Sequence, residues 1–453
     1  MTPDTKLRFD QALLPDGWSR NVTVTVRDGL IANIAVGSQA ETSTERHAIG
    51  IPGMNNVHSH VFQRAMAGMA ERRASEDNFW GWRDQVYRIA ARTDPDSLRA
   101  VAALAQIEML ECGFTRVGEF HYLHHDRDGR PYSDLANMSR ALFDAAAESG
   151  IALTHLPVFY AHSDFGGAPP EFGQRRFVCD LDTYADLLDA CVSGAADLPD
   201  ALVGIAPHSL RAVTPGELHR LIDLAGDRPI HIHIAEQLRE VERCRETTGT
   251  SPVRWLFENF PVTSNWCLVH ATHIDPEEVA AIARSKAVVG LCPITEANLG
   301  DGIFPAKDFI FAGGRYAIGT DSNVLIDMPE EMRLLEYAQR LATRTRSALA
   351  TKDHTSVGRS IFESALYGGA QALGTLSGLT VGAAADIVSL DGNSLYVLGR
   401  NDDFLLDSLL FSAGSKIIDC VWRNGIRVVS NGVHAKRQII EEGFRKILPR
   451  LME

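Results

Sequence analysis

The chain has 453 residues, of which 45% are hydrophobic and 23% charged, and its formal net charge at pH 7 is −14. This length and composition predict a folded globular protein with a large core and more than one ordinary domain. The negative charge argues against nucleic acid or an anionic membrane surface as the main partner, and no apolar run reaches the length of a membrane span.

The N-terminal segment and the cysteines are typical of a protein of the cytoplasm. Residues 1–10 are polar and charged, without the apolar stretch of a secretory signal behind them. The seven cysteines are scattered, odd in number and free of Cys-x-x-Cys pairs. This pattern is typical of reduced thiols and argues against a cysteine metal site, so we expect a cytoplasmic protein.

The N-terminal residues predict short strands joined by turns. Residues 22–27 alternate between apolar and polar side chains, as in a half-buried strand. Asp28-Gly29 then predicts a two-residue hairpin turn, and residues 30–34 predict the second strand.

The C-terminal residues predict a matching β-rich segment. Residues 385–392 and 420–425 predict strands closed by Asp-Gly and Asn-Gly turns, and residues 434–452 predict a polar helix. We therefore expect residues 1–50 and 371–453 to form one small β-sandwich domain, built from both termini, with the C-terminal helix attached.

The middle of the chain, residues 51–370, alternates apolar strand-like runs with helix-like segments such as residues 96–111. This α/β alternation over about 300 residues predicts a (β/α)8 TIM-like barrel, in which the active site lies at the carboxyl ends of the strands. The strand-like runs cover residues 153–159, 202–206, 230–234, 267–270, 287–292 and 316–319.

Four apolar stretches in this region end in a possible metal ligand or acid–base residue, and three of them supply the expected ligands. Residues 51–57 run into His58-Ser59-His60, and residues on a strand that are two apart face the same side. His233 and Asp321 follow two further apolar stretches. Three nitrogens and one oxygen suit one divalent metal, with zinc as the expected ion and one position left for water. Such water is acidified and becomes a usable nucleophile.

Three residues near these ligands are candidates for proton transfer. Glu236 follows His233 by three residues and can take a proton from the activated water and pass it to a leaving amine. His270 ends its own apolar stretch and can orient the hydroxide or polarise the substrate, and Asp321 can share the proton work. His231 lies deeper on its strand, and we interpret it as a buried structural residue.

Lysine is informative through its absence between Lys6 and Lys286. Many two-metal barrels of this kind bridge their metals with a carboxylated lysine on a middle strand. That residue type is unavailable on strands two to six here, so we expect a single-metal site.

Together these residues resemble the amidohydrolase superfamily, in its mononuclear deaminase branch, over nearly the whole chain. Four longer strings resemble the N-formimino-L-glutamate deiminases of bacterial histidine degradation. They are FWGWR at 79–83, EFHYLHH at 119–125, GIAPHSLR at 204–211 and TEANLGDGIFP at 295–305.

The resemblance implies hydrolysis of N-formimino-L-glutamate to N-formyl-L-glutamate and ammonia. It also implies that Gln63, Tyr122 and His208 line the substrate site. Because this substrate carries two carboxylates, it needs cationic partners, and Arg211 and then Arg83 are the candidates. Histidines 121, 124 and 125 are expected to have structural roles in loops rather than to bind another metal.

Two alternatives stay open at this stage. One is a related deaminase that acts on a purine, pyrimidine or guanidine-type substrate, which would not require two carboxylate-binding arginines. The other is a non-catalytic metal-binding barrel, against which Glu236 and His270 argue. Relatives in this superfamily are often dimeric, so a homodimer is the expected assembly by analogy.

Overall fold

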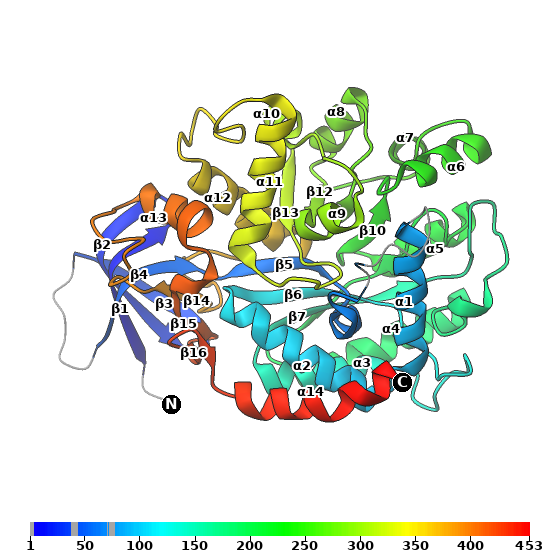
Figure 1. Ribbon diagram of the computed structural model, residues 1–453, viewed down its shortest axis with the longest axis horizontal. Coiled ribbons are helices and arrows are strands. Elements are labelled where there is room, and N and C mark those ends of the chain that lie inside the picture. The colour runs from blue at the N-terminus through cyan, green and yellow to red at the C-terminus, as the bar shows by residue number, and fades with distance from the viewer. Residues whose placement is uncertain (1–3, 38–43, 70, 72–77) are drawn as a thin grey trace.

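The computed structural model describes residues 4–37, 44–69, 71 and 78–453, and the structural statements below concern these residues. A twisted sheet built from both ends of the chain lies beside a barrel of parallel strands surrounded by helices (Figure 1). The (β/α)8 barrel and the β domain from both termini, expected from the sequence, are both confirmed.

The barrel consists of parallel strands that follow one another in the chain and in space. Two sheets, in the orders β5-β6-β7-β8 and β10-β11-β12-β13, are joined by the bridges Ile205↔Ile230 and Ser209↔His233. The bridge Ser59↔Asp321 closes the barrel on the other side. The strands are β5 (Met54–Ser59), β6 (Phe114–His121), β7 (Ala152–Phe159), β8 (Leu202–Val203), β9 (Ala206–Pro207), β10 (Ile230–Ile234), β11 (Trp266–His270), β12 (Val288–Leu291) and β13 (Arg315–Ile318).

The fourth barrel strand differs from its prediction. Residues 202–206 were expected to form one strand, but it is divided into β8 and β9 around Gly204. A Cβ at Gly204 would lie 2.7 Å from both the Leu156 Cδ2 and the Pro229 carbonyl oxygen. The backbone passes too close to its neighbours there for any other residue, and the regular pairing is interrupted.

Helices cover the outside of the barrel, and several begin with a cap that their sequence encodes. Asp94, Thr214 and Asp275 each accept a hydrogen bond from the first turn of the following helix, and proline follows each of them. The helices are α1 (Asn78–Arg92), α2 (Pro95–Glu111), α3 (Asn137–Ser149), α4 (Leu181–Ala195), α5 (Pro215–Ala225), α6 (Leu238–Thr248), α7 (Pro252–Asn259), α8 (Pro276–Ser285), α9 (Pro293–Leu299), α10 (Ala306–Phe311), α11 (Met328–Thr343) and α12 (Val357–Ala372). Two short 3-10 turns, η1 (Val61–Met66) and η2 (Phe172–Gln174), lie near the cavity described below.

The second sheet has the strand order β17-β16-β15-β14-β4-β1-β2-β3, so strands from both termini meet in its centre. The bridge Leu30↔Ala384 brings its β3 edge back toward β14, so the sheet folds over a core that contains Phe9, Val24 and Trp422. Its strands are β1 (Thr5–Leu14), β2 (Gly17–Arg27), β3 (Leu30–Val36), β4 (Glu45–Pro52), β14 (Ile387–Leu390), β15 (Ile418–Arg423), β16 (Ile426–Ser430) and β17 (Val433–His434).

Turn chemistry fixes two hairpins of this sheet. Asp28 and Gly29 have φ of 50° and 81°, and Asn424 and Gly425 have φ of 48° and 73°. Positive φ at both central residues is the geometry of the turns that Asp-Gly and Asn-Gly favour. The predicted C-terminal helix begins later than expected: α14 spans Arg437–Met452, and His434 belongs to β17.

A buried ion network links the β domain to the barrel. Arg423 on β15 contacts both carboxylate oxygens of Asp200 at 3.1 Å, and Arg116 on β6 contacts Asp200 Oδ2 at 2.9 Å. Both arginine side chains are only 4% exposed. Arg423 also donates to Asp386, just before β14. Buried charges of this kind are stable only when paired.

All seven cysteines are buried, and their sulfurs form no disulfide. They are spread over both parts of the fold, from Cys112 after α2 to Cys267 on β11 and Cys420 on β15. Among the described residues, no helix combines the length and apolar character needed to cross a membrane.

Candidate active site

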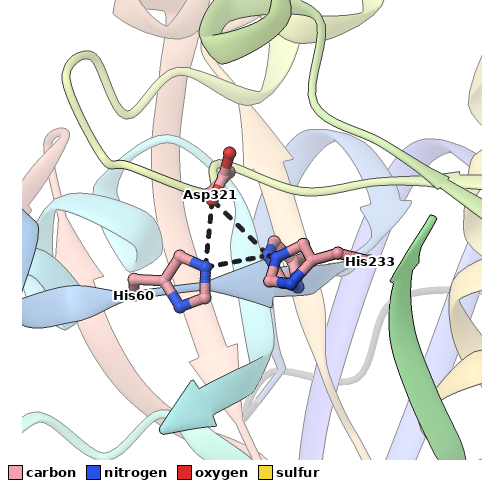
Figure 2. Close-up of side chains that lie close together, drawn as sticks. His60, His233 and Asp321 are labelled. Atoms are coloured by element: carbon pink, nitrogen blue, oxygen red, sulfur yellow. Dashed lines mark hydrogen bonds and ion pairs between the residues drawn. The ribbon is translucent and has the colours of Figure 1, made fainter. Parts of the chain in front are cut away.

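Four predicted metal ligands meet at the carboxyl ends of the barrel strands. His58 and His60 come from the end of β5, His233 from β10, and Asp321 from the turn after β13. His58 Nε2 lies 3.2 Å from His60 Nε2 and 3.0 Å from His233 Nε2. Asp321 Oδ1 lies 3.4 Å from His58 Nε2 and 3.3 Å from His60 Nε2. Figure 2 shows His60, His233 and Asp321 pointing toward one common centre.

The protonation of these histidines suits a cation at that centre. His60 Nδ1 donates to the Phe120 carbonyl oxygen at 2.8 Å, and His233 Nδ1 donates to the His208 carbonyl oxygen at 3.0 Å. Their protons are therefore on Nδ1, and the Nε2 lone pairs face the cluster. Burial lowers the pKa of His58 to about 3. Neutral nitrogens and a carboxylate this close repel one another without a cation, so the donor set fits a divalent metal.

A buried polar network holds the first and last barrel strands in register beneath these ligands. The Asn56 side chain accepts from the Thr320 backbone N–H at 3.1 Å and donates to Thr320 Oγ1 at 2.7 Å. Asn323 Nδ2 donates to Ser59 Oγ at 3.1 Å and to the Asp321 carbonyl oxygen at 2.9 Å. These bonds fix the position of Asp321 relative to the β5 ligands.

Three strand ends at the site adopt an unusual backbone conformation. Ala235, His270 and Asp321 have φ of 51°, 68° and 44°. A positive φ is unfavourable for residues other than glycine by about 1–3 kcal/mol each, and such conformations concentrate at functional sites. Each chain turns at this point, and His270 and Asp321 face the cavity there, as does Glu236 directly after Ala235.

Glu236 and His270 lie beside the ligand cluster. His270 Nε2 is 3.9 Å from Glu236 Oε1 and 3.9 Å from Asp321 Oδ2. Burial opposes protonation of His270, but the surrounding carboxylates, Glu236 first among them, outweigh it and raise its pKa to about 10. Burial also raises the pKa of Glu236, and the His270 charge opposes that shift. His270 and Glu236 therefore favour the charged form of each other.

Two functional carboxylates here were not predicted from the sequence. Glu296 Oε1 accepts from His270 Nδ1 at 3.2 Å and from the Cys292 backbone N–H at 2.8 Å. Glu240 accepts from the backbone N–H groups of Ala235 and Glu236 at 3.1 and 3.2 Å, so it fixes the turn that carries Glu236. Each is a glutamate in the first turn of a helix, which from sequence alone indicates only a favourable helix start.

The cluster forms the floor of a cavity of about 510 Å³. Every predicted site residue lines it except His58, which is fully buried beneath. The predicted residues that line the cavity are His60, Gln63, Arg83, Tyr122, His208, Arg211, His233, Glu236, His270 and Asp321.

Four arginines line this cavity, and the two predicted ones, Arg211 and Arg83, give it local positive charge in an acidic protein. Arg211 is half-buried, and no described residue forms a hydrogen bond with its Nε. Burial disfavours its charge, but Glu240 and other acidic groups more than compensate and raise its pKa. Arg83 Nη2 lies 3.7 Å from Glu171 Oε2 at the cavity wall. Guanidinium groups at the cavity wall can receive carboxylates.

Gln63 and Tyr122, expected at the substrate site by resemblance, contact each other. Gln63 Nε2 donates to the Tyr122 hydroxyl at 3.0 Å, and both side chains are buried at the cavity. The His208 ring packs against Tyr160, with centroids 4.7 Å apart, and against His233, with centroids 5.0 Å apart. Burial lowers the pKa of His208 well below its usual value, so the ring is neutral.

The remaining candidate histidines have structural contacts, either hydrogen bonds to backbone carbonyl oxygens or packing against other rings. His231 Nε2 donates to the Ala372 carbonyl oxygen at 2.8 Å and so attaches the end of α12 to the barrel. His124 and His125 donate to the carbonyl oxygens of Val158 and Val178 at 2.8 and 2.7 Å. His121 packs its ring on His124 and His155. None of these rings belongs to the ligand cluster.

Comparisons with known proteins agree with this geometry. The model of the "Amidohydrolase family" matches residues 49–428, and that of "Formimidoylglutamate deiminase HutF, N-terminal domain" matches residues 9–48. The chain is 46% identical to a formimidoylglutamate deiminase of Pseudomonas aeruginosa, over 98% of this chain and 99% of that protein. It is 26% identical to a 5-methylthioadenosine/S-adenosylhomocysteine deaminase of Natronomonas pharaonis, over 86% of this chain and 85% of that protein.

Solved structures give the same result for the fold. A crystal structure of an amidohydrolase from Brucella melitensis superposes with a TM-score of 0.96 at 46% identity, covering 99% of this chain and 100% of that one. A zinc-bound adenosine deaminase from Xanthomonas campestris superposes with a TM-score of 0.83 at 22% identity, covering 99% of this chain and 98% of that one, which supports the fold alone.

Proposed function

The chain belongs to the amidohydrolase family, and within it to the formimidoylglutamate deiminases, and we propose that it hydrolyses N-formimino-L-glutamate in histidine degradation. The products are N-formyl-L-glutamate and ammonia. One observation carries the proposal: a ligand cluster with an adjacent proton-transfer carboxylate shares one cavity with four arginines, among them Arg211 and Arg83. An amidine group and two carboxylates are what such a cavity can receive.

The ligand cluster would hold one zinc ion through His58, His60, His233 and Asp321. When bound, a divalent ion of this type makes water acidic enough to act as a nucleophile at neutral pH and polarises the group under attack.

Glu236 transfers the proton in this scheme. Water adds to the formimino carbon, and the Glu236 carboxylate accepts the proton that the water releases. Glu236 gives this proton to the terminal nitrogen, so the tetrahedral adduct carries a hydroxyl and an NH2 group. When the adduct collapses, Glu236 accepts the hydroxyl proton as the C=O bond forms and gives it to the same nitrogen as the C–N bond breaks, so that this nitrogen departs as ammonia. His270, held by Glu296, keeps the Glu236 carboxylate in place.

Arg211 and Arg83 bind the two carboxylates of the substrate, while Gln63, Tyr122 and His208 border the space between them and the metal ligands. A buried dianion needs fixed cationic donors, and guanidinium groups supply two parallel N–H bonds to a carboxylate. A purine or pyrimidine carries no carboxylate to place against these guanidinium groups, which disfavours ring substrates here.

The test is ammonia release from N-formimino-L-glutamate, compared with guanine, a panel of aminopyrimidines and guanidine compounds. We expect turnover of the formimino compound alone. Faster release from a ring substrate would overturn the assignment, and zinc binding without any ammonia release would point to a non-catalytic barrel.

Further properties accompany this proposal. The protein acts in the cytoplasm, which agrees with seven unpaired, buried cysteines. It assembles as a homodimer and comprises a small β domain, residues 1–50 and 371–453, and the barrel, residues 51–370. Sedimentation equilibrium tests the assembly, and limited proteolysis tests the division into domains.

A further inference from the structure

Tyr160 lines the cavity but has no part in the steps above. It follows β7 by one residue, at the carboxyl end of the barrel, and is 7% exposed. Burial and the neighbouring Tyr87 raise its pKa, whereas Arg211 and Arg83 oppose the increase. The phenol therefore lies within the electrostatic influence of both arginines.

Gln174, in η2, fixes how the Tyr160 hydroxyl is hydrogen-bonded. Gln174 Oε1 accepts from the Glu171 backbone N–H at 2.7 Å. Because a backbone N–H can only donate, the amide oxygen must lie on this side and the NH2 group on the other. Gln174 Nε2 then donates to the Tyr160 hydroxyl oxygen at 2.8 Å.

This arrangement determines where the Tyr160 proton can go. Since its oxygen accepts from an amide NH2 group, the hydroxyl proton must point away from Gln174. No residue in the described part of the chain accepts that proton through a hydrogen bond. A phenolic O–H facing a cavity beside two arginines is suited to an anionic acceptor.

The turn that carries Gln174 is packed closely against the cavity wall. A Cβ at Gly173 would lie 2.7 Å from Tyr87 Cδ2, so the Tyr87 ring rests directly on the glycine backbone. The Tyr87 hydroxyl oxygen lies 3.5 Å from Gln174 Nε2. The position of the amide is thus fixed by packing as well as by hydrogen bonds.

We propose that Tyr160 is a specificity-determining residue, whose hydroxyl donates a hydrogen bond to one of the two substrate carboxylates that Arg83 and Arg211 bind. Gln174 is the positioning residue that keeps this proton available. The inference rests on the proposed function, since it adds a phenol donor to one of the two carboxylates of that substrate. The arginines supply charge, and the phenol supplies a directional donor that selects for a carboxylate at one position.

The first experiment is Tyr160→Phe, which removes one oxygen from the cavity. We measure kcat/KM for N-formimino-L-glutamate, for the N-formimino derivatives of L-2-aminobutanoate and 4-aminobutanoate, which each keep one carboxylate, and for N-propylformamidine, which has none. A lost hydrogen bond to a charged group predicts a decrease of about 10- to 100-fold. The decrease is expected mainly in KM, for the dicarboxylate and one monocarboxylate, with the neutral compound unchanged. Equal losses on all four compounds, or none on the dicarboxylate, would overturn the inference.

Tyr184→Phe is the matched control. Tyr184 is fully buried, donates to the Pro157 carbonyl oxygen at 2.9 Å, and lies outside the cavity lining. This variant tests whether the loss of any buried tyrosine hydroxyl lowers turnover simply by destabilising the protein. We expect unchanged ratios of kcat/KM among the four substrates.

The second experiment compares Gln174→Glu with Gln174→Leu. Glutamate keeps the oxygen that receives the Glu171 N–H, but its second oxygen would accept the Tyr160 proton and withdraw it from the substrate. Leucine removes the hydrogen bond to the Tyr160 hydroxyl but adds no acceptor for its proton. We therefore expect the glutamate variant to have the higher KM for N-formimino-L-glutamate. A purely structural role predicts the reverse order, because glutamate is the closer replacement in shape.

Calorimetry with N-formyl-L-glutamate separates this inference from the proposed function, since it needs no turnover. Binding that Tyr160→Phe weakens about 10- to 100-fold supports the carboxylate contact even if the wild-type protein releases no ammonia. Wild-type ammonia release together with equal binding by both proteins overturns the contact and leaves the activity in place.

Discussion

Asp200 is predicted to be the residue on which the junction between barrel and β domain depends most. Its carboxylate is the charged partner of Arg116 and, with Asp386, one of the two charged partners of Arg423. Both arginine side chains are 4% exposed. In Asp200→Ala, Arg423 retains Asp386. Arg116 retains only uncharged acceptors, among them Thr154 Oγ1 at 3.3 Å.

The expected loss follows from leaving one buried guanidinium without a counter-charge. Breaking a buried ion pair from one side typically costs about 3–5 kcal/mol, and because Asp200 is itself 28% exposed we expect the lower end, about 3 kcal/mol. Urea unfolding at constant pH measures it, with Asp10→Ala as control. Asp10 pairs with Arg46 at the surface, where the side chains are 42% and 69% exposed, so its loss should be below about 1 kcal/mol. Equal midpoints for the two variants would refute the reasoning.

Four further predictions concern the site and its surroundings. Glu236→Gln should retain the metal and lose about 10²-fold or more in kcat, because it removes the group that moves the proton; near-normal turnover by the metal-loaded variant would exclude that role. Elemental analysis should find one divalent ion per chain, and chelation should abolish ammonia release, whereas two tightly bound ions would contradict a mononuclear site. Arg211→Ala should lower kcat/KM for N-formimino-L-glutamate by the equivalent of about 2–5 kcal/mol and hardly affect N-propylformamidine; equal losses on both would assign Arg211 to structure. Burial raises the pKa of Glu331 well above its usual 4.5, so the folded state holds a proton that the unfolded state releases. The free energy of unfolding of the wild type should therefore fall as the pH rises above about 4.5. Urea unfolding at about pH 5 and about pH 8 should show a smaller fall for Glu331→Gln. An equal fall in both proteins would contradict this role of Glu331.

The sequence predicted those parts of the fold that local chemistry determines. Residues 230–234 form a strand with the expected bounds, and Asp28-Gly29 and Asn424-Gly425 form the expected turns, since apolar runs and positive-φ residues act over a few positions. The division of the fourth strand at Gly204 depends on the approach of Leu156 and Pro229, which no local pattern records.

The same distinction applies to the site. His58, His60, His233 and Asp321 were predicted because metal ligation restricts residue type and position on a strand. Glu296 and Gln174 were not, because glutamate and glutamine are common in helix starts and turns. Their roles depend on His270 and Tyr160, which lie 26 and 14 residues away in the chain.

The buried cysteines can report when the structure around each of them opens. Burial raises the pKa of Cys267 and Cys292 on the barrel side and of Cys420 in the β domain, so each thiol reacts with an alkylating reagent only after its surroundings open. Mass spectrometry of alkylated peptides would then time the opening of each region separately. The order in which Cys420 and Cys267 become labelled would show whether the β domain or the barrel unfolds first.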